Sequence, residues 1–301
     1  MEFSLGALLA GLTVGLVVGV TGSGGGALLT PLLILALHVE AKSAVASDLV
    51  ASVFMRPVAG LVHLRRSLVH WPIVGWLVAG SVPTAFAGGV LSTIFLPTSV
   101  ADRVLEPAIG GVLLFSGAAA IARRLAPARR RAERGRLAGH LRPRRLPTVL
   151  LGVAGGLAVG VTSVGAGTLM LVGLALIYPA LSSYELVGTD LVQAVPLVLA
   201  AALGHLAAGG LHVSLTTAVV VGGVPGAALG AWASRFVPAR ALGFVVAVVI
   251  FGSGCALIGW VPGSIAGACG ALVLGASAAW RRRRVPRVAP SAGEQPATLQ
   301  A

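Results

Sequence analysis

The stretch Val20-Thr21-Gly22-Ser23-Gly24-Gly25-Gly26 interrupts a long apolar run near the start of the chain. It returns once, in altered form, as Val161-Thr162-Ser163-Val164-Gly165-Ala166-Gly167, again inside an apolar run. Such a break cannot face lipid, because the backbone N–H and C=O groups that it frees from helical bonding find no water there. Each break is therefore expected to be buried in protein or to line a polar cavity, which makes the pair our first candidate for a functional site.

The composition around these breaks is that of a membrane protein. Of the 301 residues, 56% are hydrophobic and only 10% are charged, and the mean hydropathy is +0.95, which is outside the range of soluble domains. Several apolar runs reach the ~20 residues that a helix needs to span ~30 Å of hydrocarbon. We therefore predict an all-α polytopic protein of the cell (plasma) inner membrane.

The basic residues are concentrated in two places. Fifteen of the 22 are Arg that lie between Arg123 and Arg145 or between Arg281 and Arg287, beside apolar runs. This is the arrangement of cytoplasmic loops under the positive-inside rule. Neither cluster is interleaved with the aromatic residues that stack on bases, so nucleic acid is not expected as a partner. Anionic lipid headgroups of the bilayer are the partner that these clusters suit.

The two halves of the chain form an internal repeat with an offset of 141 to 142 residues. Asp48-Leu49 matches Asp190-Leu191, and polar or special residues recur in register beyond it. The further matching pairs are His63 with His205, His70 with His212, Gly80 with Gly222, Pro83 with Pro225 and Gly88 with Gly230. The predicted units are membrane repeat 1 (1–122), an Arg-rich cytoplasmic loop (123–147), membrane repeat 2 (148–260), an extra transmembrane helix (261–280) and a basic disordered cytoplasmic tail (281–301).

The topology follows from placing both Arg clusters in the cytoplasm, which requires an even number of crossings between them. The runs 187–208, 213–234, 239–259 and 263–280 supply four. The run 148–178 must then supply none or two, and at 31 residues it is too long for one span and too short for two. A re-entrant hairpin fits this run and 3–38, so each repeat is a Gly-rich hairpin plus about three transmembrane helices, and the repeats are inverted. The alternative is one broken helix per run that crosses once, which would place Arg281 to Arg284 outside.

Six segments of the chain are typical of one family: Gly19-Val-Thr-Gly-Ser-Gly-Gly-Gly26, Leu28-Leu29-Thr30-Pro31, Ala44-Val45-Ala46-Ser47-Asp48-Leu49, Gly188-Thr189-Asp190-Leu191, Gly60-Leu-Val-His63 and Leu203-Gly-His205. In these segments the chain resembles the sulfite exporter TauE/SafE family of membrane permeases. The resemblance extends to about residue 258. It implies two copies of a four-element membrane unit and the transport of sulfite, sulfoacetate and related small anions.

The two glycine breaks are candidate substrate sites, because half-helix N-termini offer free N–H groups and a positive dipole end to an anion. The alternative is that the glycines only permit tight helix crossings. The candidate residues are Thr21, Gly22, Ser23, Gly24, Gly25, Gly26, Thr162, Ser163, Gly165 and Gly167.

Arg56 is the third candidate for substrate binding, since an ionisable group in mid-membrane costs ~2.5 to 3.5 kcal/mol to insert and marks function by default. Pro57 follows it and is expected to kink the helix. A guanidinium is always charged and can hold an oxyanion with two hydrogen bonds. The alternative is a structural pairing with Asp48 or with a backbone carbonyl.

Two pairs of repeat mates are candidates for proton coupling. Asp48 and Asp190 lie near the start of apolar runs, which favours helix N-capping, but a carboxylate in an apolar cavity can also load and release a proton. His63 and His205 are expected to be packing histidines near helix ends, with proton relay as the alternative.

We conclude from the sequence that the chain is a secondary permease for a small anion, working by alternating access, and proton coupling through the carboxylates is a separate hypothesis. An anion channel with a re-entrant half-helix filter is the main alternative. No partnered catalytic group or metal-type ligand cluster is evident, so an enzyme, a metal site and a cofactor are not expected, and a membrane-embedded enzyme or assembly factor is a distant third hypothesis.

Overall fold

The fold was analysed in a computed structural model of the chain, which describes residues 5–21, 26–64, 69–125, 143–165, 167–209, 211–234 and 239–259. Across these ranges every regular element is a helix. The elements are α1 (Leu5–Thr21), η1 (Gly26–Leu28), α2 (Leu29–Leu37), α3 (Ala41–Leu64), α4 (Trp71–Ile94), α5 (Thr98–Leu125), α7 (Arg145–Thr162), α8 (Thr168–Ile177), α9 (Ser183–Ala207), α10 (Val213–Ala233) and α11 (Ala239–Leu257).

Several predicted features lie outside the described residues. They are Gly22, Ser23, Gly24 and Gly25 of the first break, most of the Arg-rich loop, the extra helix at 261–280 and the tail at 281–301.

Five helices in the described part of the chain are long and apolar enough to cross a membrane. These spans are Trp71–Ile94, Val100–Ala122, Arg145–Thr162, Glu185–Ala207 and Val213–Ala233. Large apolar side chains are exposed on them, among them Phe86, Phe115 and Leu206, as expected where lipid rather than water surrounds the protein. The all-helical membrane class predicted from composition is confirmed.

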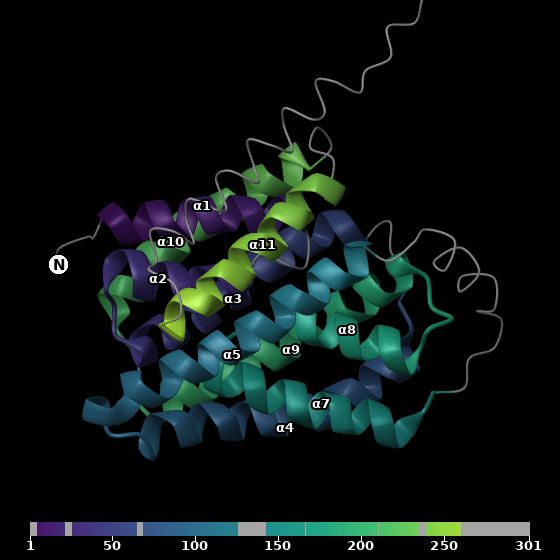
Figure 1. Cartoon of the computed structure of the whole chain (residues 1–301), viewed down its shortest axis with the longest axis horizontal. Helices are drawn as coiled ribbons and strands as arrows, with labels where there is room; N and C mark the ends of the chain where they lie inside the picture. Colours follow the sequence, from purple (N-terminus) through teal and green to yellow (C-terminus); the bar gives the residue numbers. More distant parts are fainter. Residues whose placement is uncertain are drawn as a thin grey trace, which may run out of the picture.

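Each Gly-rich break falls between two helices, but the two arms are unequal. The first arms, α1 and α7, have 17 and 18 residues, whereas the second arms, α2 and α8, have 9 and 10. The start of α1 and the end of α2 lie at one end of the molecule, left in Figure 1, and the start of α7 and the end of α8 lie at the other. Two half-helices were expected in each run, but only the second arm of each has the length of a half-helix, and the first arm is nearly twice as long.

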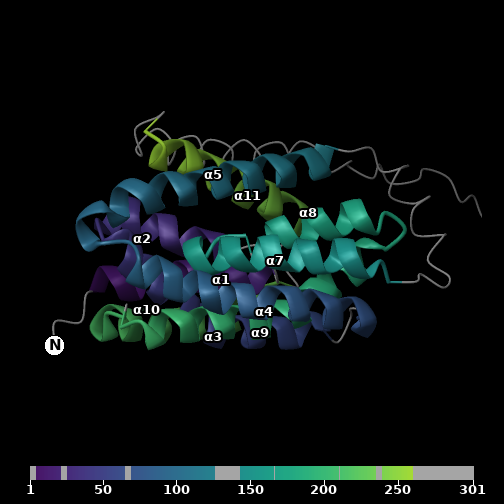
Figure 2. The ribbon, with the colours of Figure 1, turned by 90° about the horizontal axis from the view of Figure 1, so that it is seen from below.

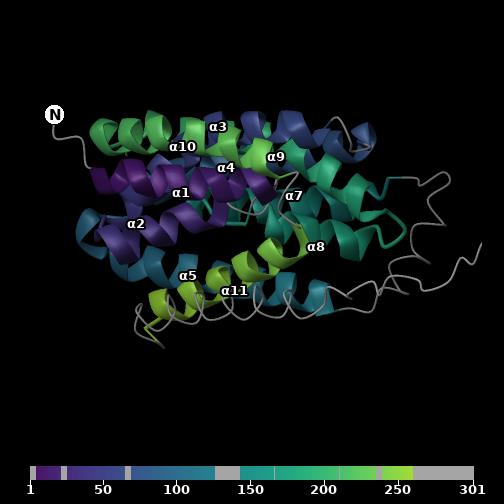
Figure 3. The same ribbon diagram turned by 90° about the horizontal axis from the view of Figure 1, so that it is seen from above.

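Helix pairing follows the internal repeat. Helix α1 packs against α10, and its repeat mate α7 packs against α4, the mate of α10. The mates α3 and α9 contact each other, as do α5 and α11. Figures 2 and 3 show α5 and α11 as a layer on one face, with the short helices α2 and α8 next to it.

The two tight crossings are built on stripes of small residues spaced four apart. Gly11, Gly15 and Gly19 on α1 face α10, and Gly152, Gly156 and Gly160 on α7 face α4. A Cβ atom at any of these six positions would overlap a backbone carbonyl oxygen of the partner helix. These glycines let the helix backbones touch, as small residues do in membrane bundles. Gly19, next to the first break, therefore permits a tight helix crossing, which is the alternative role considered for the glycines.

The direction of α3 and α9 can be read from contacts at their ends. Near the start of α3, the Lys42 ammonium donates to the carbonyl oxygen of Thr93, 3.1 Å away at the end of α4. Near the start of α9, Glu185 Oε1 lies 3.1 Å from Nε2 of His70, the residue before α4. The start of α3 thus lies beside the end of α4, and the start of α9 beside its beginning, so α3 and α9 run in opposite directions.

Candidate functional site

Asp48 lies at the centre of a polar cluster that joins the two halves of the chain. Its Oδ2 accepts hydrogen bonds from the hydroxyls of Thr30, at 2.7 Å, and Ser163, at 2.5 Å. The Thr30 and Ser163 hydroxyl oxygens are 2.6 Å apart, and Oδ1 accepts from Ser52 at 3.3 Å. We call Asp48, Thr30 and Ser163 the hydroxyl–carboxyl triad.

Each member of the triad comes from a different element. Thr30 is in the first turn of α2, immediately after the first break, and Asp48 is on α3. Ser163 is in the second break, where the chain adopts left-handed conformations at Ser163 (φ 57°) and Gly165 (φ 103°). The second conformation favours glycine because it has no Cβ. The turn after α7 thereby points a hydroxyl of the second repeat at a carboxylate of the first.

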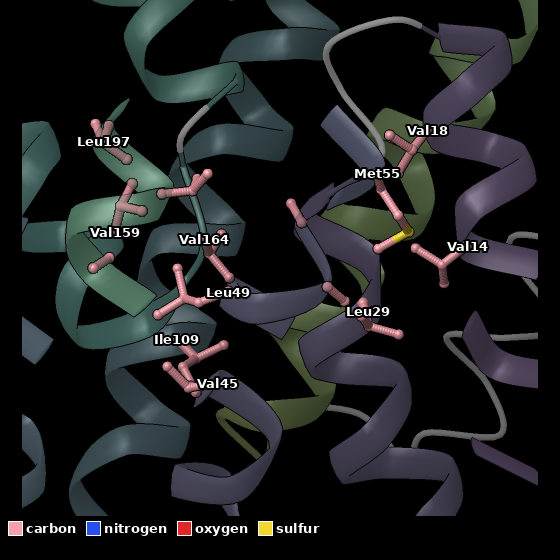
Figure 4. Close-up of a cluster of buried hydrophobic side chains, with 14 of the residues drawn as sticks. Val14, Val18, Leu29, Val45, Leu49, Met55, Ile109, Val159, Val164 and Leu197 are labelled. Carbon is pink, nitrogen blue, oxygen red and sulfur yellow. The ribbon is translucent and has the colours of Figure 1, made fainter. Parts of the chain in front are cut away.

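Three of the side chains that flank the triad in sequence are apolar and buried. Leu29, Leu49 and Val164 each follow or precede a triad residue, and all three belong to one buried hydrophobic cluster (Figure 4). Ile109 of α5 lies next to them in the same cluster. Thr30, Asp48 and Ser163 are themselves at most 4% exposed, so this polar cluster lies in the interior of the protein.

Arg56 lies two helical turns further along α3 and is 8% exposed. Its positive charge interacts with the carboxylate of Asp190 and, more weakly, with that of Asp48. The Arg56 Nε atom is buried and has no hydrogen-bond partner among the residues that the structure describes. Such a group costs free energy to bury unless something binds to it, so the guanidinium retains a donor for a ligand.

The repeat mate Asp190 occupies a different polar environment. Its Oδ1 accepts from Gln193 Nε2 at 3.4 Å, and Gln193 Oε1 in turn accepts from the Ser81 hydroxyl of α4 at 3.4 Å. Asp190 is 1% exposed. The two mates therefore both interact electrostatically with one cation, Arg56, whose own mate is the buried and apolar Val198.

The interpretation of Asp48 and Asp190 as N-caps is wrong. Each is the eighth residue of its helix, because α3 begins at Ala41 and α9 at Ser183. The cap of α9 is Ser182, which forms a capping box with Glu185. At the start of α3, the Ala41 N–H donates to Asp102 of α5 at 3.0 Å. Neither carboxylate therefore caps its helix.

Three other predicted residues, Thr21, Thr162 and His205, form hydrogen bonds away from the triad. Thr21 and Thr162 donate their hydroxyl hydrogens to carbonyl oxygens of their own helices, Val17 at 2.7 Å and Ala158 at 2.6 Å. The ring of His205 is buried, with Nε2 2.8 Å from the Gly160 carbonyl oxygen and Nδ1 3.1 Å from the Thr93 hydroxyl. This is the arrangement of a packing histidine.

His63, Gly26 and Gly167 are placed by the backbone. His63 is in the last turn of α3, which is described only along its main chain there. Gly26 opens η1, and Gly167 is the N-cap of α8.

Thr30, Ser52, Ser81 and Gln193 belong to the site but were not predicted. Thr30 stands in one of the segments on which the family resemblance rests, Leu28-Leu29-Thr30-Pro31, and a hydroxyl immediately after a helix break is a signal that could have singled it out. Gln193, one turn after Asp190, is an isolated polar residue in an apolar run and could have been found in the same way.

An all-helical bundle with membrane-length helices and a buried charged centre between two helix breaks is the architecture of a multi-pass membrane transporter. The family model described as "Sulfite exporter TauE/SafE" matches residues 7–257. The chain belongs to this family, which consists of membrane transporters and not of enzymes.

Two curated relatives come from Bacillus subtilis strain 168. The "Probable membrane transporter protein YjnA" is 35% identical over 257 residues, which are 85% of this chain and 100% of the relative. The "Probable membrane transporter protein YdhB" is 27% identical over 226 residues, 74% of this chain and 87% of the relative. No solved structure matches the chain. The match across most of the length supports a multi-pass protein of the plasma membrane.

Proposed function

We propose that the protein is a secondary transporter of small sulfur-containing anions, such as sulfite or organosulfonates of the sulfoacetate type. The observation that carries this proposal is Arg56, a buried cation whose Nε atom lacks a hydrogen-bond partner within the described residues. A sulfonate or sulfite group offers two oxygens at the spacing that suits the planar guanidinium fork. The family to which the chain belongs supports the same class of substrate.

Alternating access between two inverted repeats is the proposed mechanism. It is supported by the opposite directions of α3 and α9 and by the matched packing of α1 on α10 and of α7 on α4. In transporters of this kind the site lies where the repeats meet, near discontinuous helices. Arg56, Asp48 and Asp190 lie on the two helices that meet there, and both breaks are proposed to be re-entrant hairpin tips.

Proton coupling follows from the charges at this centre. Arg56 supplies one positive charge, and Asp48 and Asp190 supply up to two negative charges. An entering anion adds further negative charge in a medium of low dielectric, where like charges repel strongly. Proton binding to one of the carboxylates would offset that charge, so we propose that the anion moves together with a proton.

Flux measurements in proteoliposomes test the proposed substrate class. We expect saturable flux of sulfite or of a short organosulfonate, with acetate and chloride as comparison anions. Absence of flux for every sulfur oxyanion and sulfonate in the panel would refute the proposal. Flux that rises linearly with concentration and carries single-channel currents would instead identify the alternative, an anion channel.

The proton-coupling step predicts a specific loss in carboxylate variants. Asp190→Asn and Asp48→Asn together are expected to abolish anion accumulation driven by a pH gradient, because no carboxylate beside Arg56 can then carry a proton. Glu106→Gln, which removes a carboxylate of α5, is the control and is expected to keep accumulation. Gradient-driven accumulation that survives in the double variant would show that protons are not coupled through these residues.

A further inference from the structure

The hydroxyl–carboxyl triad has a feature that the proposed function does not use: its three oxygens form a closed triangle. Thr30 Oγ1 is 2.7 Å from Asp48 Oδ2, Ser163 Oγ is 2.5 Å from the same Oδ2, and the two hydroxyl oxygens are 2.6 Å apart. Oxygens at such separations are hydrogen-bonded, since O–H···O bonds are about 2.5–3.0 Å long. Each of the three edges therefore needs a hydrogen.

Counting hydrogens distinguishes the two states of the carboxyl group. Each hydroxyl supplies one hydrogen, and an ionised carboxylate supplies none. If Thr30 and Ser163 both donate to an ionised Asp48, no hydrogen remains for the contact between the two hydroxyl oxygens. A protonated Asp48 supplies the third hydrogen. The ring is then complete, with the carboxyl donating to one hydroxyl, that hydroxyl donating to the other, and the second donating back to Oδ2.

We propose that Asp48 binds a proton in this conformation, and that the protonated carboxyl closes a hydrogen-bonded ring between the starts of the two repeats. The ring joins α2, directly after the first break, to the turn of the second break through α3. Release of the proton to water leaves two hydrogens for three contacts. One of the three oxygen–oxygen contacts must then lose its hydrogen bond. The turn between α7 and α8 is then no longer joined to α2 by a complete ring of hydrogen bonds.

The charged groups around Asp48 are few. On its own helix, Arg56 acts on it electrostatically, and Asp190 of the adjacent α9 acts on Arg56. The described parts of α1, α2 and α10, which also pack against α3, contain no ionisable side chain. Helix α5 carries Asp102, bonded to the first residue of α3, with Arg103 and Glu106 close to it in sequence.

Arg56 connects this proton site to the substrate, and this step rests on the proposed function. The guanidinium stabilises the ionised form of Asp48 by attraction between opposite charges. An anion bound to Arg56 offsets that attraction and so favours the protonated carboxyl and the closed ring. Anion binding and proton binding at Asp48 are then expected to be mutually favourable, as linkage requires.

Infrared spectroscopy of the whole protein in lipid tests the proton site without any transport measurement. We expect the carbonyl-stretch band of a protonated carboxyl at neutral pH and expect Asp48→Asn to remove it. Thr30→Val and Ser163→Ala, which keep the carboxyl but each remove one ring member, are expected to shift the band. Thr217→Ala is the control, since its hydroxyl donates to the Val213 and Ser214 carbonyl oxygens of its own helix, α10, and it is expected to leave the band in place.

Three results would overturn the inference: no protonated-carboxyl band at neutral pH, a band that persists in Asp48→Asn, or a band unmoved in both hydroxyl variants. The hydroxyl variants keep the test decisive even if Asp48→Asn does not fold. The outcome is separable from that of the proposed function. Protein that shows the band but transports no anion would refute the substrate and keep the proton site, and saturable flux without the band would do the reverse.

Discussion

Replacement of Arg56 by Gln is expected to lower the affinity for the transported anion by about 10- to 100-fold. Hydrogen bonds to charged groups contribute ~1.5 to 3 kcal/mol, and each 1.4 kcal/mol corresponds to roughly tenfold in affinity. The loss is made worse because Asp48 and Asp190 would lose the cation whose charge interacts with both of them. Concentration dependence of flux in proteoliposomes, for the anion that the wild type transports, measures the effect.

Two further variants sharpen the Arg56 experiment. Arg56→Lys keeps the charge but loses the planar fork and the Nε donor, so we expect an affinity between those of the wild type and the Gln variant. Arg145→Gln removes an Arg that stacks over Trp76, 5.3 Å from the ring centroid, at the start of α7. It is expected to transport as the wild type does. Wild-type affinity in Arg56→Gln would exclude Arg56 from the substrate site.

The second large effect is expected from the glycine stripes. Gly15→Ala and Gly156→Ala should each destabilise the protein by about 1–3 kcal/mol, the usual cost of overpacking. In both cases the new Cβ would overlap a backbone carbonyl oxygen, of Gly223 and of Ser81 respectively. Backbone atoms cannot rotate away as a side chain can, so the helices must separate. Thermal unfolding and gel filtration in detergent measure the loss.

The matched control is the same substitution at a glycine with open space around it. Gly111 on α5 has no atom within 4 Å of the position that a Cβ would occupy, so Gly111→Ala is expected to be neutral or to stabilise the helix by up to about 1 kcal/mol. If Gly15→Ala and Gly156→Ala unfold at the same temperature as Gly111→Ala, close backbone contact at the two crossings is not what holds the bundle together.

Helix positions in the chain were predictable because the signals for them are local. The apolar run predicted at 187–208 corresponds to α9 (Ser183–Ala207), and the run predicted at 213–234 is α10 (Val213–Ala233). Interruption of the two long runs by glycine was likewise visible in the sequence. Burial of Arg56 followed from its place inside an apolar run, and the structure places it in the interior.

The N-capping error shows where local signals were misread. Helix α3 begins at Ala41, seven residues before Asp48, because its polar start is held by groups from elsewhere in the chain. The Lys42 ammonium binds the carbonyl oxygens of Thr93 and Leu96, and Asp102 accepts from the backbone of Ala41. For α9 the signal was present, since Ser182 and Glu185 have the spacing of a capping box.

The sequence by itself determined the membrane class, the helices, the internal repeat and the family. It did so because hydropathy, glycine breaks and recurring motifs are properties of neighbouring residues or of a fixed offset. Only the tertiary structure decided that Ser163 meets Asp48, 115 residues away in the chain, and that Arg56 interacts electrostatically with two repeat-related carboxylates. Those contacts depend on which helices pack together, and packing between helices far apart in the chain, such as the backbone contact along the glycine stripes, is not a property of any local pattern.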